Sequence, residues 1–233
     1  IKVYGSEAES FIVDEALQIH GGMGFSAESE ISTHYRNVRG NRIYEGTNEI
    51  NRILIPTMLL RKAMKGELPF MQAAMSSFQE LQSGLLTAPK NGPGTYDLAI
   101  SFLENIKKAS LLSSGLAAQY FQEKIKDQQE VLMSLADIMI QVYLFESTLL
   151  RTIKHKDVKN ASIRKNMIDV LMFETADLLL KSTREVVFAC SNQEQAISNL
   201  KGIQRLYQLP AINLKESRRA IANYFIDQNS YTI

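Results

Sequence analysis

A single carboxylate stands out in the stretch RIYEGTNEI, residues 42–50, where Glu45 lies between Tyr44 and Gly46. A glycine beside a carboxylate lets a bound molecule approach closely, and a carboxylate next to an apolar ligand can act as a general base. A solvated glutamate in an ordinary turn would leave the same pattern. The motif alone therefore does not decide between these two interpretations.

Other combinations of residue types that carry chemistry are weak in this sequence. The three histidines, His20, His34 and His155, have no cysteine or paired carboxylate at metal-ligand spacing, so each is expected to be a polar or capping residue. No G-x-S-x-G turn of a serine hydrolase is present. The glycine-rich GGMG, residues 21–24, follows a predicted helix and not a strand, so it is neither a phosphate-binding loop nor a dinucleotide-binding turn. We predict no metal site.

Composition excludes several classes of protein. The formal net charge of the 233 residues is +1, which argues against a nucleic-acid binder with a concentrated basic face. The one cysteine, Cys190, excludes an intramolecular disulfide and fits a reducing compartment. No apolar run reaches the roughly 20 residues that span a bilayer. Because Ile1 opens a stretch that already has a helical pattern, we expect a processed product or a fragment of a longer polypeptide.

The elements that must position these residues are helices, because apolar residues recur with helical spacing and strand signals are scarce. In the region from 127 to 155, an alternating spacing of four and three predicts the seam of a bundle, formed by Leu135, Met139, Val142, Glu146, Leu149 and Ile153. Helices are predicted over 3–20, 29–36, 47–65, 69–82, 96–124, 127–155, 160–190, 193–208 and 215–227. We therefore predict an all-α fold in which one helical bundle is followed by a second.

Several residues should mark the ends and breaks of these helices. Gly21 and Gly22 should stop the first helix, with a loop over 23–29, and a turn is expected at Gly40. Thr47 should cap the helix after Glu45, and Pro56 should kink or open that helix. The clearest loop is 83–95. The methionine pairs at 71 and 75, 133 and 139, and 167 and 172 are expected to fill the core.

Two motifs in fixed register resemble the C-terminal helical domain of acyl-CoA dehydrogenases. They are ALQIHGGMGF, residues 16–25, and YRNVRGNRIYEGTNEINR, residues 35–52, and the spacing from Gln18 to Glu45 is that of the family. The likeness covers about residues 1–65. The length and helical character of the remainder resemble the extra C-terminal helical domain of the very-long-chain branch. The resemblance implies that residues 1–66 are the C-terminal part of a catalytic helical domain and that 67–233 are an additional helical domain.

The resemblance implies a reaction and a cofactor. Members of the family oxidise an acyl-CoA to the trans-2-enoyl-CoA: a glutamate removes the α-proton while FAD accepts the β-hydride. The position that matches this base is Glu45, and Gly46 would give the substrate room beside it. Those that match the family's FAD contacts are Gln18, Ile19, His20, Gly21, Gly22, Thr47, Asn48 and Glu49. The first five would reach FAD bound mainly by a neighbouring subunit, and the last three open a helix whose N–H groups suit an anionic dinucleotide.

The resemblance also implies what would surround this chain. In the family, an N-terminal helical domain and a middle β-domain hold the flavin ring and much of the acyl-CoA, so the chain alone is expected to be inactive and to bind FAD weakly or not at all. The expected partners are a long-chain acyl-CoA, an electron-transfer flavoprotein as acceptor, and a second copy in a homodimer. The expected location is the cytoplasm of a bacterium, or the mitochondrial matrix or inner membrane of a eukaryote, and not outside the cell.

Two features leave parts of this picture open. The basic stretch 151–165 could meet anionic lipid at a membrane surface, and a solvated loop with ordinary lysines explains it as well. The family usually has an arginine–aspartate pair where this chain has Arg36 and Asn37, which would alter a local ion pair and not the reaction.

Two other interpretations of the resemblance stay open. An acyl-CoA oxidase-like enzyme would pass the electrons to oxygen and not to an electron-transfer flavoprotein. A non-enzymatic assembly module would keep the helical fold without the reaction; Glu45 argues against it, because a scaffold does not need a base. An upstream substrate arginine and a flavin-binding β-domain would favour the enzyme.

Overall fold

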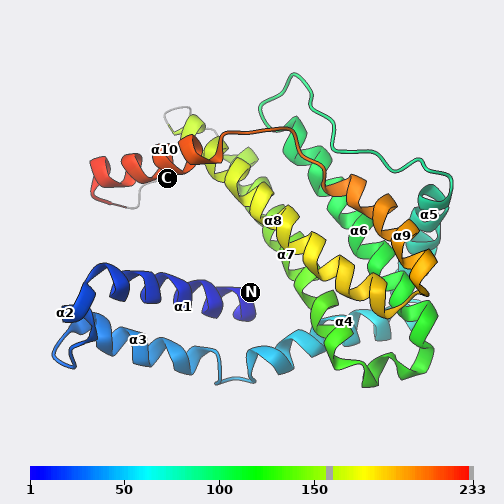
Figure 1. Cartoon of the computed structure of the whole chain (residues 1–233), viewed down its shortest axis with the longest axis horizontal. Coiled ribbons are helices and arrows are strands. Elements are labelled where there is room, and N and C mark those ends of the chain that lie inside the picture. The colour runs from blue at the N-terminus through cyan, green and yellow to red at the C-terminus, as the bar shows by residue number, and fades with distance from the viewer. Residues whose placement is uncertain (156–159, 231–233) are drawn as a thin grey trace. The chain divides into compact units, whose positions relative to one another are not determined.

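A computed structural model describes residues 1–155 and 160–230, and every regular element in this part of the chain is a helix (Figure 1). The all-α prediction is confirmed. The elements are α1 (Lys2–Ile19), α2 (Gly21–Phe25), α3 (Glu30–Asn41), α4 (Asn48–Met64), α5 (Phe70–Gln82), α6 (Asp97–Phe121), the 3-10 helix η1 (Gln122–Asp127), α7 (Gln129–Lys154), α8 (Ala161–Ala189), α9 (Gln193–Gln204), the 3-10 helix η2 (Arg205–Tyr207) and α10 (Leu214–Gln228).

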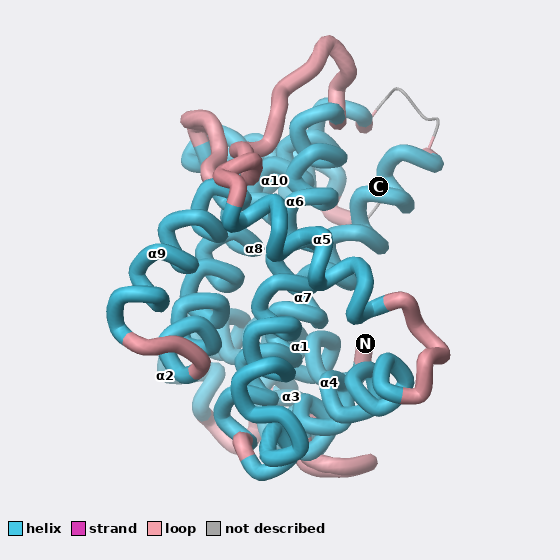
Figure 2. The backbone as a smooth tube through the Cα atoms, turned by 90° about the vertical axis from the view of Figure 1, so that its right-hand side faces the viewer, coloured by secondary structure: helices cyan, strands magenta, loops and turns pink. Residues whose placement is uncertain are grey.

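The chain divides into two compact units, Ile1–Met58 and Leu59–Ile233. In the first unit, α1 and α3 lie side by side and α2 connects them (Figure 1). In the second unit, α6, α7 and α8 pack against one another, α5 packs on α6, and α9 and α10 pack on α8 (Figure 2). The assignment of residues 1–66 and 67–233 to a catalytic and an additional domain stays a prediction.

The end of α1 matches the predicted stop, and the loop predicted over 23–29 is correct for 26–29 but not for 23–25, which are helical. Gly21 has a φ of +59°, a left-handed conformation that ends α1 and that glycine adopts without a steric penalty. The residues from there to Phe25 then form α2. At Gly24, an added Cβ would lie 2.6 Å from the carbonyl oxygen of Leu17. The glycine therefore allows α2 to pack closely against the end of α1, and it does not form a turn.

The turn predicted at Gly40 is also wrong, because α3 continues to Asn41. An added Cβ at Gly40 would lie 2.6 Å from the ring of Tyr44, so the absent side chain makes room for an aromatic ring. The irregular stretch comes later, over 42–47, and leads into α4. There the predicted cap is confirmed: the hydroxyl oxygen of Thr47 accepts a hydrogen bond from the amide of Ile50 at 3.3 Å. Pro56 lies inside α4 and does not interrupt it.

The second unit has its core on the facing sides of α6, α7 and α8. At its centre, the rings of Phe102 and Phe145 are fully buried and meet edge to face, with centroids 5.1 Å apart. The seam predicted for α7 is correct only in part, since Ile153 is 44% exposed and Glu146 forms an ion pair with Lys107 at the edge of the bundle. The large side chains that α7 buries most deeply are Leu132, Leu135, Ile138, Phe145 and Leu149.

Among the described helices, α7 is the one long and apolar enough, by length and composition alone, to cross a membrane. The sequence predicted no such segment. Contacts with both α6 and α8 account for this composition, because a helix at the centre of a bundle needs apolar residues on more than one face.

Candidate functional site

Glu45 lies in the turn between α3 and α4, with its side chain exposed to solvent. Its backbone φ is +57°, in the left-handed region that residues with a Cβ rarely occupy, and Gly46 follows with a φ of +80°. Elsewhere in the described residues, only Gln122 and Asn229 share this property among the non-glycine residues. Unfavourable backbone conformations of this kind are concentrated at functional sites, where surrounding contacts maintain them.

Side chains hold the backbone of this turn. The side-chain nitrogen Nδ2 of Asn51 lies 3.3 Å from the carbonyl oxygen of Glu45, 2.7 Å from that of Gly46 and 3.1 Å from that of Thr47, and it donates to all three. The ammonium group of Lys2 donates to the carbonyl oxygen of Gly46 at 2.8 Å. The turn is thus attached both to the first turn of α4 and to the start of α1.

Asn48 lies directly beneath the turn and is fully buried. Its side-chain oxygen accepts from Lys2 at 2.7 Å, and its side-chain nitrogen donates to Ser6 at 2.9 Å and to Glu7 at 3.1 Å. Its backbone amide donates to the carbonyl oxygen of Arg42 at 3.1 Å. The polar atoms of Asn48 serve the contact between α1 and α4, and its cofactor contact stays a prediction.

An ion pair closes the same contact. Arg52 donates two hydrogen bonds to the carboxylate of Glu7, at 2.6 and 2.7 Å, in the two-pronged geometry that suits a guanidinium group. The hydrogen bond from Arg52 lowers the pKa of Glu7, although burial opposes the shift. Helix α1 therefore binds the start of α4 through the charged and polar side chains of Lys2, Ser6 and Glu7.

The other two residues predicted at the start of α4 have accessible surface. Thr47 is half-buried and Glu49 is exposed. Hydrogen bonds from its own backbone N–H and from the hydroxyl of Thr47 lower the pKa of Glu49. Its carboxylate lies in the first turn of α4, where the positive end of the helix dipole favours a negative charge.

The remaining predicted cofactor residues, Gln18, Ile19, His20, Gly21 and Gly22, are all exposed around the end of α1. Nothing lies within 4 Å of a Cβ built on Gly21 or Gly22, so the backbone there is open to close approach. The ring of His20 is hydrogen-bonded to the carbonyl oxygen of Ala16 at 2.8 Å. The 18 residues of α1, at about 1.5 Å each, separate this group from the Glu45 turn by about 27 Å, so the structure does not bring the two groups together.

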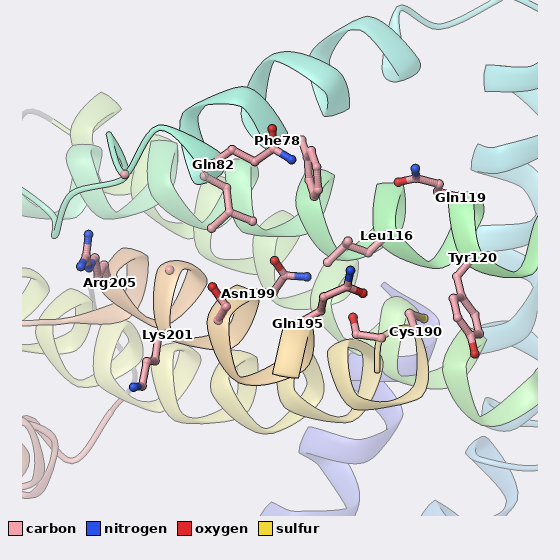
Figure 3. Close-up of a pocket in the computed structure, with 15 residues that line it drawn as sticks. Phe78, Gln82, Leu116, Gln119, Tyr120, Cys190, Gln195, Asn199, Lys201 and Arg205 are labelled. Carbon is pink, nitrogen blue, oxygen red and sulfur yellow. The ribbon is translucent and has the colours of Figure 1, made fainter. Parts of the chain in front are cut away.

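Sequence reasoning missed the cavities of the second unit, which include the following two. One, of about 780 Å³ between α5, α6 and α9, is lined in part by the amide side chains of Gln82, Gln119, Gln195 and Asn199 (Figure 3). Cys190 also lines it, and burial raises the pKa of this thiol to about 11. The other, of about 500 Å³, is apolar and is lined in part by Met71 and Met75, which are 53% and 64% exposed and so do not fill the core as predicted.

Two further predictions concern bound ions and membranes. Among the described residues, no group of three or more histidine, cysteine, aspartate or glutamate side chains could hold a metal ion. Part of the basic stretch 151–165, residues 156–159, lies outside the described residues.

Comparisons with known proteins give the chain a family. Two models of the acyl-CoA dehydrogenase C-terminal domain match it, one over residues 1–60 and the other over 105–205. A probable acyl-CoA dehydrogenase of Bacillus subtilis (strain 168) is 35% identical over 235 residues, which cover 100% of this chain. The chain belongs to the acyl-CoA dehydrogenase family. The fold of this chain is also similar to that in a crystal structure of an acyl-CoA dehydrogenase complexed with FAD from Bacillus anthracis, with a TM-score of 0.91 and 36% sequence identity over 100% of this chain.

Other members of the acyl-CoA dehydrogenase family match shorter parts. The mitochondrial very long-chain specific enzyme of Homo sapiens is 35% identical over 117 residues, 50% of this chain and 16% of that protein. The short-chain specific enzyme of Homo sapiens is 48% identical over 60 residues, 26% of this chain and 15% of that protein. The chain spans 39% of both Bacillus proteins.

Proposed function

We propose that this chain carries the catalytic base of a flavin-dependent acyl-CoA dehydrogenase, and that Glu45 removes the α-proton of the acyl-CoA. The observation that carries the proposal is the backbone of Glu45: a solvent-exposed carboxylate on a left-handed residue, in a turn that Asn51 and Lys2 hold in place. A glutamate in an unconstrained turn needs no such support. The whole enzyme would convert an acyl-CoA to the trans-2-enoyl-CoA.

The amide group of Glu45 supports the same role. Within the described part of the chain, its N–H donates no hydrogen bond, so it can donate to the thioester carbonyl oxygen of a bound substrate. That donation would stabilise the negative charge that develops on the oxygen as the carboxylate takes the α-proton. Exclusion of water by the substrate would also strengthen the carboxylate as a base.

Gly46 would give the thioester space beside the base. The nearest atom to a Cβ built on Gly46 is the side-chain nitrogen of Asn51, at 3.1 Å, so a larger residue would press on the side chain that holds the turn. Its φ of +80° would also strain any residue with a Cβ. Both effects favour glycine at this position.

FAD, when bound, supplies the acceptor for the β-hydride. The exposed residues Gln18 to Gly22 fit a cofactor contact, because the backbone at Gly21 and Gly22 is open. Thr47 and Glu49 fit a second contact through their accessible polar groups at the start of α4. The distance of about 27 Å along α1 favours contacts with two different FAD molecules, which a homodimer would provide.

The finer features of the reaction rest on relatives. The match to very long-chain specific enzymes extends over 50% of this chain and supports a long acyl chain as substrate. An electron-transfer flavoprotein is the proposed electron acceptor, and an oxidase-like transfer to oxygen is the alternative. Because the chain spans 39% of its Bacillus relatives, we expect the chain alone to be inactive and to bind FAD weakly or not at all.

The test is anaerobic reduction of the flavin by long-chain acyl-CoA in the full-length protein. We expect the visible flavin absorbance of the wild type to bleach, and that of Glu45→Gln to persist with unchanged FAD content and substrate binding. Glu67→Gln is the matched control, because Glu67 is exposed and lies in the loop after α4. Equal bleaching of wild type and Glu45→Gln would place the base elsewhere. A wild type that binds neither FAD nor acyl-CoA would favour the assembly module, and rapid reoxidation of the reduced flavin by oxygen would favour the oxidase.

A further inference from the structure

The Glu45 turn depends on contacts from outside itself. Three successive carbonyl oxygens, those of Glu45, Gly46 and Thr47, accept hydrogen bonds from the single side chain of Asn51. One of them, Gly46, also accepts from Lys2. Because a left-handed backbone is unfavourable for a residue with a Cβ, the conformation of Glu45 needs contacts of this kind to persist.

Lys2 has an unusual environment for a lysine. Among the described residues its ammonium pairs with no carboxylate, and it donates to two neutral oxygens, the carbonyl of Gly46 and the side-chain oxygen of Asn48. Asn48 is fully buried and is fixed in turn by Ser6 and Glu7. The buried side chain of Asn48 therefore fixes the position of the Lys2 ammonium, and the ammonium in turn holds the carbonyl group of Gly46 in the turn.

These contacts fix the direction of the catalytic groups. The peptide bond is planar and trans, so holding the carbonyl oxygen of Glu45 on the Asn51 side sets the plane of the peptide that follows Glu45. With that plane and a φ of +57° both set, the directions of the Glu45 side chain and of its N–H are determined up to side-chain rotation. The two groups proposed to act on the substrate thus share one support.

We propose that Asn51 and Lys2 are positioning residues, which hold Glu45 in its left-handed conformation and aim its carboxylate and N–H at the acyl-CoA. This inference rests on the proposed function of Glu45. Neither residue touches the substrate. Each acts through the carbonyl oxygens of residues 45–47, and its loss would let the turn relax toward an ordinary backbone conformation.

The test compares four variants of the full-length protein. Asn51→Leu keeps the size of the side chain and removes the donors, and Lys2→Met removes the ammonium. Lys2→Arg restores a charged donor. Asn37→Leu is the matched control, since Asn37 is exposed on α3 and the structure gives it no part in the turn.

The main measurement is the rate constant of flavin reduction per bound FAD at saturating acyl-CoA. Misplacement of a reacting group by about 1 Å costs about 100-fold in rate, so we expect losses of 10- to 100-fold in Asn51→Leu and Lys2→Met. FAD content and substrate affinity should stay within about twofold, and Lys2→Arg should recover most of the rate. A merely structural role would lower the FAD content and leave the rate per bound FAD unchanged, which would overturn the proposal.

Two further readouts keep the inference separate from the proposed function. An acyl-CoA with sulfur at the β position has no β-hydride to lose, so exchange of its α-protons in D2O reports the base step alone and should slow by the same factor. Hydrogen exchange of the Asn48 amide, bonded to the carbonyl of Arg42 across the turn, should speed up in Asn51→Leu. If Glu45→Gln reduces flavin normally, the proposed function fails, and unchanged exchange at Asn48 would overturn the support of the turn on its own.

Discussion

The edge-to-face contact between Phe102 and Phe145 allows a quantitative test of the second unit. Both rings are fully buried, with centroids 5.1 Å apart and planes at 81°. Phe145→Ala removes a whole buried ring and leaves a cavity, so we expect the free energy of unfolding to fall by about 4 kcal/mol. Tyr143→Ala is the control on the same helix, because Tyr143 is 56% exposed, and its effect should stay within about 0.5 kcal/mol.

A double-mutant cycle isolates the contact between the rings. Phe102→Leu, Phe145→Leu and the double variant keep most of the apolar volume, and the coupling between the two sites should be about 1 kcal/mol, the usual energy of an aromatic pair beyond its burial. The assay is urea unfolding of the protein followed by far-ultraviolet circular dichroism, with the slope compared among variants. Equal effects of Phe145→Ala and Tyr143→Ala would refute the burial argument, and a coupling near zero would refute the ring contact.

Three other predictions concern single residues. The pKa of Glu7 lies below its ordinary 4.5 because of Arg52, so the charged carboxylate stabilises the fold above pH 4.5, and this stabilisation is lost as the pH falls through the lowered pKa. The melting temperature of Glu7→Gln should therefore decline less steeply below about pH 4.5 than that of the wild type. An unchanged pH profile would contradict the role of the Glu7–Arg52 pair. Gly202→Val should lower the free energy of unfolding, measured by urea unfolding, by about 1–3 kcal/mol, because a Cβ there would lie 2.2 Å from Leu81 on α5. An unchanged free energy of unfolding would show that Leu81 moves aside and would contradict the prediction. Cys190, with its pKa raised to about 11, should react with iodoacetamide at pH 8 much more slowly in the folded protein than in urea, and equal rates would show that the thiol is not buried.

Helical periodicity was enough to locate most of the helices, and the errors share a physical cause. The sequence treats Gly24 and Gly40 as breaks, yet both lie inside helices because the absent Cβ makes room for Leu17 and for the ring of Tyr44. A contact of this kind depends on neighbours in space, and glycine's low helix propensity points the other way. The α7 seam was only partly correct for a related reason: the spacing of residues defines a stripe along the helix, but packing places Glu146 at the edge of the bundle, where it pairs with Lys107.

The candidate site divides in the same way. The motif around Glu45 was visible because its residues are adjacent in sequence. The contacts that hold it were not visible, because Lys2 lies 44 residues from Gly46 and 46 from Asn48, and no local pattern links them. Asn51 offered a weaker signal, as a second asparagine four residues after the capping Thr47. Its side chain can reach back over the helix start, which is the usual behaviour of asparagine near a turn.

The unit Ile1–Met58 is held together more by these polar contacts than by a core. Its buried apolar residues are Val3 and Val38, while several larger ones are mostly exposed: Phe11, Ile12, Ile19, Phe25 and Ile50 each expose more than 60% of their surface. Apolar surface of this extent usually belongs to an interface. The proposed homodimer and the rest of the acyl-CoA dehydrogenase would cover it, and covering it would also exclude water from the Glu45 turn. The expected inactivity of the isolated chain then has a physical reason: the proposed base and its proposed support lie in this chain, and the surfaces that would enclose a substrate around them would come from other parts of the assembly.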